Sequence, residues 1–206
     1  MRMAIALALS LATSNLLASD HAMPKPKDAS TYASHDAHAA EHVVIAAEAY
    51  DTKEKGKFFR VDYVGNGFMP IYIVVTNNGD KPISLDQARI DFISAENDRI
   101  PAAQPEDVER RMTHIKSGKV IPLPAPLPPV KTKPKTPDKK IEQDFSDFQY
   151  SATTVPPHST RAGFLFYDMQ GLGDKPLRGA KLTLRDLRDG DGKELFYFEI
   201  ALDKYL

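Results

Sequence analysis

The hydrophobic and polar positions are most regularly arranged in residues 68–85, where a run of β-favouring residues ends at an Asn-Asn-Gly-Asp turn. In an extended strand, successive side chains point to opposite faces. One face of this strand holds Ile71, Ile73 and Val75, and the other holds Tyr72 and Val74. Because both faces are apolar, the pattern predicts an inner strand with both faces at least partly covered. The pair Asn78-Gly79 favours the positive φ angles of a tight turn.

Several other stretches also favour strands. Residues 57–63 (KFFRVDY) alternate apolar and polar side chains, as a half-buried strand does. Further strands are expected at residues 43–45, through Ile90 and Phe92, and at 161–169, 179–187 and 193–202. In the last strand, one face is expected to hold Phe196, Phe198, Ile200 and Leu202, and residues 188–193 (RDGDGK) predict a hairpin turn before it. Short strands separated by turns predict two antiparallel sheets packed face to face, an all-β fold.

Two short helices interrupt this β pattern. The first begins near Pro105, which suits the first helical position, and Glu106 and Asp107 favour its N-terminal end. The second is expected within residues 139–150. Its apolar residues recur at helical spacing: Ile141, Phe145 and Phe148.

A proline-rich insertion separates the two helices, at about residues 120–140. Seven prolines between Pro122 and Pro137 favour an extended polyproline II backbone, which has no internal hydrogen bonds. Its end, Lys131–Lys140, holds five lysines against one aspartate. This charge favours weak contact with anionic surfaces, and the alternative is a soluble spacer that proline keeps extended.

The N-terminal residues predict export. Residues 1–19 have the form of a secretory signal peptide, with a positive charge at Arg2, an apolar run and then small residues. The apolar run is too short to span a bilayer, so we expect its removal and no transmembrane segment in the mature chain. Residues 20–41 contain few large apolar side chains and predict a flexible or weakly helical arm. Residues 42–206 are expected to form one domain, located in the periplasm or outside the cell.

Composition narrows the class of protein. The chain has no cysteine, so its stability must come from a core rather than from disulfides. A formal net charge of -1 provides no global field that would attract nucleic acid. The expected partners are therefore proteins or other components of the cell envelope.

Three stretches resemble a known group of proteins: GFMPIYIVVTNNGDKPISL, TTVPPHSTRAGFLFYDM and KELFYFEIAL. They are similar to uncharacterised exported bacterial proteins with an immunoglobulin-like, telokin-like β-sandwich domain. The resemblance covers residues 43–100 and 153–206 and rests on turn and core residues. It implies an immunoglobulin-like antiparallel β-sandwich and a location in the envelope, and the residue pattern adds one or two short helices. It transfers no catalytic residue and no cofactor.

The candidate metal ligands are His35, His38 and His42. In a helix these residues would share one face, where neutral imidazoles bind zinc, copper or nickel. The alternative is a solvated arm with nothing to fix the rings. The acidic run 189–194 is too short for a calcium loop and favours a hairpin turn.

Nucleophilic catalysis is not expected, because the chain has neither a G-x-S-x-G elbow nor a cysteine. The sequence therefore predicts a noncatalytic exported binding or structural module of the bacterial cell envelope that needs no cofactor. The alternative is a metal-binding or metal-carrying envelope protein that uses His35, His38 and His42.

Overall fold

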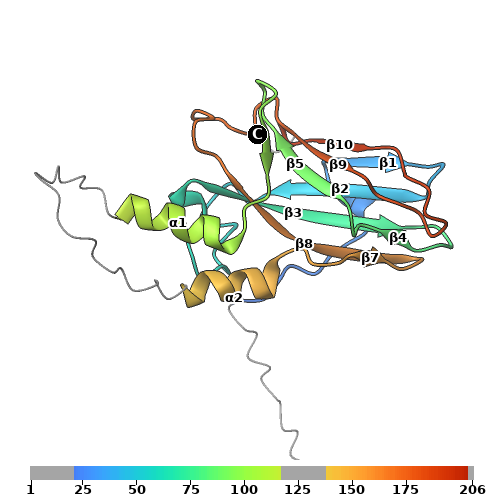
Figure 1. Ribbon diagram of the computed structural model, residues 1–206, viewed down its shortest axis with the longest axis horizontal. Helices are drawn as coiled ribbons and strands as arrows, with labels where there is room; N and C mark the ends of the chain where they lie inside the picture. Colours follow the sequence, from blue (N-terminus) through green and yellow to red (C-terminus); the bar gives the residue numbers. More distant parts are fainter. Residues whose placement is uncertain (1–20, 117–137, 204–206) are drawn as a thin grey trace, which may run out of the picture.

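The computed structural model describes residues 21–116 and 138–203, which fold mostly as antiparallel β-sheet with two short α-helices (Figure 1). The first sheet has the strand order β1 (His35–His38), β2 (Val43–Ala49), β3 (Phe68–Asn77) and β8 (Ser159–Asp168). The second has the order β10 (Phe198–Ala201), β9 (Lys181–Arg185), β5 (Arg89–Ile93) and β6 (Arg99–Pro101). A two-stranded sheet pairs β4 (Ile83–Ser84) with β7 (Thr154–Val155). The predicted signal peptide and most of the predicted proline-rich insertion lie outside the described residues.

The expectation of an all-β fold is confirmed, because the described residues form mainly antiparallel sheets and only two short α-helices. Strand β3 lies between β2 and β8 and is buried along its whole length. Its two faces belong to different hydrophobic clusters: Ile71, Ile73 and Val75 contribute to one, and Tyr72 and Val74 to the other. The alternation along this segment therefore predicted an inner strand correctly.

The first cluster lies between the two four-stranded sheets. It includes Val43, Ile45, Ile73 and Val75 from the first sheet and Phe92, Leu182, Leu184, Phe198 and Ile200 from the second. Burying this many large apolar side chains is the main favourable term in the free energy of folding.

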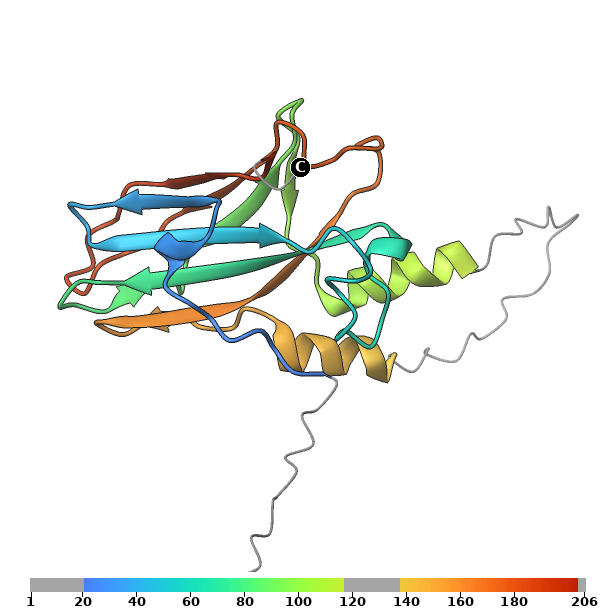
Figure 2. The ribbon, with the colours of Figure 1, turned by 180° about the vertical axis from the view of Figure 1, so that it is seen from behind.

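The second cluster covers the other face of the first sheet. Helices α1 (Pro105–Lys116) and α2 (Lys139–Phe148) lie together at one end of the molecule (Figure 1). Figure 2 shows the segment 50–67, which contains the short 3-10 helix η2 (Val64–Asn66), folded beside them. Both helices occur where the sequence predicts them. The apolar face of α2 is buried as expected, through Ile141, Phe145 and Phe148.

The strand predicted at residues 57–63 is wrong, because this segment forms turns. Phe59 and Tyr63 are buried, but they pack into the second cluster rather than in a strand. The amide groups of Arg60 and Val61 donate to the carboxylate of Asp144 instead of to a neighbouring strand. A long-range contact thus replaces the sheet ladder that the local alternation suggests.

Residues 21–41 differ from the flexible or weakly helical arm that the sequence predicts. The 3-10 helix η1 (Ala29–Thr31) is followed by β1, which pairs with β2. The Ala29 amide donates to the hydroxyl of Thr76 at 2.9 Å, and the Tyr72 hydroxyl donates to the Pro24 carbonyl at 2.9 Å. Contacts with the sheet therefore order a segment that has little local propensity for structure.

Two smaller expectations near turns are also corrected. Neither Asn78 nor Gly79 has a positive φ angle. The buried side chain of Asn77 holds the turn instead, accepting from the Gly79 amide at 2.9 Å and donating to the Lys81 carbonyl at 2.8 Å. Phe196 does not face the core with Phe198, since its side chain is 64% exposed.

Candidate functional site: a cleft at the end of the first sheet

A cleft with a volume of about 690 Å³ opens where β3 begins. The segments 50–67 and 169–178 flank it. Its apolar lining consists of Val64, Phe68, Met69, Met169, Pro176 and Leu177. Its charged lining consists of Asp51, Asp174, Lys175 and Arg178. This volume lies within the range of about 300–1,000 Å³ that is typical of sites for small molecules.

The local sequence shapes this cleft through Gly67. Its φ of +81° lies in the left-handed region, which glycine adopts without steric strain. This conformation ends η2 and starts β3 at Phe68, so the buried strand begins directly at the cleft. The carbonyl of Gly67 accepts from the Met169 amide at 2.9 Å, which ties the opposite wall to the same point.

The charges around the cleft are not balanced. Asp51 is paired with Lys55, whose Nζ lies 2.7 Å from the carboxylate. Lys175 and Arg178 are exposed, and neither forms an ion pair with a described residue. Asp174 is the remaining carboxylate of the lining. The lining thus holds two cations and one carboxylate, Asp174, that form no ion pair with any residue in 21–116 or 138–203.

The three histidines predicted as metal ligands do not converge. In the strand β1, His35 and His38 lie on opposite faces, whereas the prediction of a shared face assumed a helix. His35 Nδ1 lies 2.7 Å from the Tyr32 carbonyl oxygen, and His42 is exposed in the turn before β2, with a φ of 56°. Among the described residues, no group of three His, Asp or Glu side chains is arranged to hold a metal ion.

His38 instead joins the two sheets. Its Nδ1 lies 3.0 Å from a Glu41 oxygen, and its Nε2 lies 3.4 Å from an Asp36 oxygen. The imidazole also stacks on Phe198 of β10. Both ring nitrogens therefore face carboxylates while the ring face contacts the hydrophobic core.

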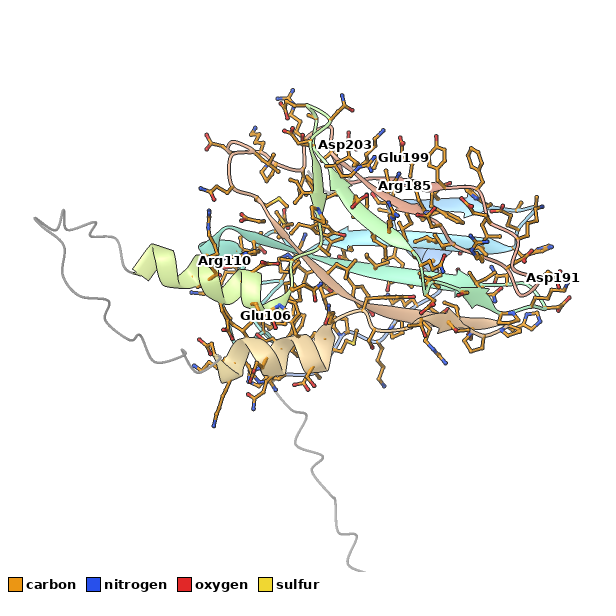
Figure 3. The ribbon with its side chains drawn as sticks, viewed as in Figure 1. Glu106, Arg110, Arg185, Asp191, Glu199 and Asp203 are labelled. Atoms are coloured by element: carbon orange, nitrogen blue, oxygen red, sulfur yellow. The ribbon has the colours of Figure 1, made fainter. Side chains whose placement is uncertain are left out.

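The same carboxylates accept from backbone amides in β10 and directly before it. Asp36 accepts from the Glu199 amide and Glu41 accepts from the Phe196 amide, each at 2.9 Å. Figure 3 shows Glu199 on this side of the second sheet, while Glu106 and Arg110 lie on α1 at the other end. Unpaired amides on an edge strand invite association with other chains, and Asp36 occupies one such amide in β10 while Glu41 occupies another two residues before the strand. We call this contact between β1 and β10 the edge seam.

The acidic run at 189–194 forms the predicted turn. The Asp189 side chain accepts from the amides of Asp191 and Lys193, each at 2.9 Å. The Asp191 carboxylate, at the tip of the molecule in Figure 3, pairs with Lys81. His158 is likewise in a turn, where its Nε2 lies 2.9 Å from an Asp80 oxygen. The contacts of these side chains therefore hold turns in place.

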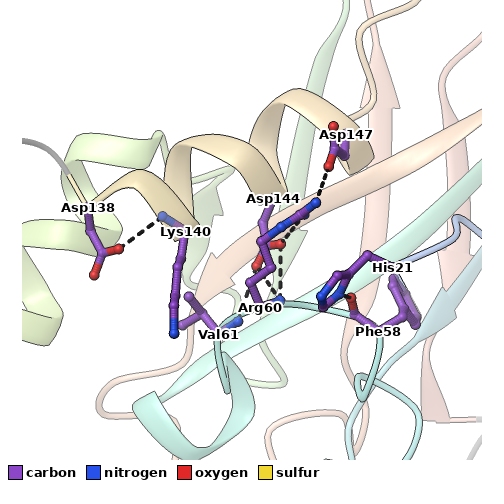
Figure 4. Close-up of polar contacts among 8 residues, drawn as sticks. All are labelled: His21, Phe58, Arg60, Val61, Asp138, Lys140, Asp144 and Asp147. Carbon is purple, nitrogen blue, oxygen red and sulfur yellow. Dashed lines mark hydrogen bonds and ion pairs between the residues drawn. The ribbon is translucent and has the colours of Figure 1, made fainter. Parts of the chain in front are cut away.

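Sequence reasoning missed Asp144 of α2, which is the most deeply buried carboxylate in the described part of the chain. It accepts hydrogen bonds from the amides of Arg60 and Val61 and from Arg60 Nη1 at 2.9 Å (Figure 4). Arg60 Nη2 also lies 2.7 Å from Asp147. The signal was an aspartate three residues after Ile141, on the apolar face of the helix. This contact fastens α2 to the segment 58–61.

Burial raises the pKa of Tyr63 well above its ordinary value, and the nearby charge of Asp144 adds to this shift. Burial also raises the pKa values of Tyr72, Tyr150 and Tyr167. These four tyrosines lie in the two hydrophobic clusters rather than in the lining of the cleft. The shifts therefore report on core packing.

Comparisons of the chain with models of protein families, with curated proteins and with solved structures gave no significant match. None of the helices in residues 21–116 and 138–203 is long and apolar enough to cross a membrane.

Proposed function

We propose that the protein is a noncatalytic, exported binding module of the bacterial cell envelope and that its ligand enters the cleft beside Gly67. The observation that carries this proposal is the cleft itself, which combines an apolar lining with unpaired charge at its rim. Sites for small molecules commonly have this composition.

The proposed architecture is an immunoglobulin-like β-sandwich. The hydrophobic cluster shared by the two antiparallel sheets supports it, and so does the edge seam, which connects the sheets along one side. A framework of this kind holds its loops in fixed positions, and loops on a rigid framework are common places for binding residues.

A noncatalytic role is supported by how the titratable side chains are used. His38, Asp144 and His158 each contact partners that hold strands, helices or turns in place. Catalysis by a histidine or a carboxylate requires that group to reach a reacting atom of the substrate. None of these three residues lines the cleft.

Binding in the cleft is tested with the neutral dye Nile red, whose fluorescence rises in apolar surroundings. We expect a rise with the unaltered protein and its loss in Val64→Trp, because the indole would fill the cleft. Val44→Trp is the matched control, since Val44 is also half-buried but pairs with Thr76 at the far end of β3. An equal signal from both variants, or no signal from the unaltered protein, would contradict the proposal.

Export is tested separately by N-terminal sequencing of the protein recovered from the periplasm or the medium. The mature chain should begin between Asn15 and Asp20. Recovery from the cytoplasm with Met1 in place would contradict export and leave binding in the cleft as a separate question.

A further inference from the structure

We propose that the ligand of the cleft is a free fatty acid, an apolar chain that ends in a single carboxylate. This inference rests on the proposed function, since it names the chemical class of molecule that the same cleft binds.

The base of the cleft favours an apolar chain. Phe68, Met69 and Leu177 line it, and each also belongs to a hydrophobic cluster of the core. Met69 lies in β3 and Met169 directly follows β8, and both line the cleft. Methionine side chains are unbranched and adaptable, so they suit a flexible chain better than a rigid ring that needs a fixed shape.

The rim favours a carboxylate. Lys175 and Arg178 lie three residues apart in one loop, and neither forms an ion pair with any residue in the described part of the chain. A guanidinium binds a planar carboxylate with two parallel hydrogen bonds, and an ammonium adds a second positive charge. The apolar base and the cationic rim thus match the two ends of a fatty acid.

The remaining acidic residues limit the charge of the ligand. Asp51 is already neutralised by Lys55 at 2.7 Å. Asp174 stands beside Lys175 and offsets one of the two rim cations. A ligand with one negative charge therefore fits this balance better than a phosphate with two.

The test displaces Nile red with three molecules that share a twelve-carbon chain, all below their micelle concentrations: dodecanoate, dodecanol and dodecyltrimethylammonium. We expect dodecanoate to displace the dye at a concentration at least about tenfold lower than dodecanol, and the ammonium compound to be the weakest. A tenfold difference corresponds to about 1.4 kcal/mol, close to the lower end of what a hydrogen bond to a charged group contributes.

The variant Lys175→Gln/Arg178→Gln should remove the advantage of dodecanoate and leave displacement by dodecanol unchanged. The matched control, Lys193→Gln/Arg161→Gln, replaces one lysine and one arginine that are exposed and lie outside the lining. This control should retain the advantage.

Equal displacement by dodecanoate and dodecanol would overturn the inference, as would an advantage that survives in Lys175→Gln/Arg178→Gln. In both cases the dye still binds, so the proposed function stands and only the class of ligand is wrong. Failure of the unaltered protein to bind the dye overturns the proposed function and this inference with it.

Discussion

The imidazole of His38 stacks on the ring of Phe198, with the ring centroids 3.9 Å apart and the planes inclined by 14°. His38 belongs to β1 of the first sheet and Phe198 to β10 of the second. The stack is therefore a direct connection between the two sheets. The imidazole lies within reach of both carboxylates of the edge seam, since Asp36 accepts from Glu199 of β10 and Glu41 accepts from Phe196, two residues before that strand.

Replacing this imidazole should destabilise the fold. We expect His38→Ala to lower the free energy of unfolding by about 1–3 kcal/mol, because it removes the stack and leaves two carboxylates without their shared partner. Urea unfolding followed by circular dichroism measures the change. His35→Ala is the control, since His35 is exposed on the other face of β1, and it should change the value by less than about 0.5 kcal/mol. Equal effects of the two variants would contradict the stabilising role assigned to His38.

The buried carboxylate of Asp144 should matter far more than its neighbour Asp147. Asp144→Ala leaves the guanidinium and amide of Arg60 without their main acceptor, so we expect a loss of about 3–5 kcal/mol. Asp147→Ala removes a partly exposed ion pair and should cost less than about 1 kcal/mol. Thermal unfolding of both variants ranks the two effects, and the reverse order would refute the role assigned to Asp144.

Two phenylalanines close together in the sequence should behave differently. Phe198 is fully buried, so Phe198→Ala should cost about 3–5 kcal/mol. Phe196 is 64% exposed and should tolerate alanine within about 0.5 kcal/mol. Denaturant unfolding separates the two outcomes. Similar losses at both positions would mean that Phe196 faces the core after all, as the alternation in the sequence suggests.

Gly163 in β8 lies directly against the backbone of Tyr150. A Cβ at this position would be 2.4 Å from the Tyr150 Cα, so the two segments would have to separate. We expect Gly163→Ala to cost about 1–3 kcal/mol or more. Gly56→Ala is the matched control, because its nearest contact would be an ordinary 3.4 Å to Phe59. A melting temperature that does not change in Gly163→Ala would contradict this close approach.

The protein should lose stability in alkaline solution. Burial raises the pKa values of Tyr63, Tyr72, Tyr150 and Tyr167 in the folded state. The unfolded chain ionises at the ordinary tyrosine pKa of about 10. Stability is therefore fully present below that pH and falls as the pH rises above it, because only the unfolded state then releases these protons.

Tyrosinate absorbance should therefore show these four tyrosines ionising together with unfolding. The variant Tyr150→Phe removes one of them, along with a hydroxyl that has no hydrogen-bond partner among the described residues. It should make the loss of stability with pH less steep. Ionisation of all eight tyrosines near pH 10 in a protein that stays folded would contradict the prediction.

The sequence by itself determined the elements whose side-chain period matches their burial. Strand β3 alternates between two covered faces, and the apolar residues of α2 recur at helical spacing. In α2 the buried apolar side chains lie on one face of the helix, and in β3 they lie on both faces of the strand. The local pattern of apolar residues is therefore enough to predict each element and its buried side chains.

The conformation of segments whose partners lie far away in the chain was determined only by the tertiary structure. Residues 57–63 alternate like a strand, but the segment forms turns in which the amides of Arg60 and Val61 donate to the Asp144 carboxylate. Residues 35–38 have little apolar content, yet pairing with β2 makes them a strand and separates His35 from His38. A local pattern does not encode such partners. The free energy of contacts with them outweighs the local propensity of the segment.

The cleft and the edge seam also form only through contacts between distant parts of the chain. Glu41 reaches the Phe196 amide across 155 residues of chain. Met69 and Met169 line one space only because β3 and β8 are paired and the loops beyond them lie close together. The sequence contains the residues of both sites. Whether these residues come into contact depends on which strands pair. Pairing brings distant parts of the chain together, and the spacing of residues along the chain does not predict it.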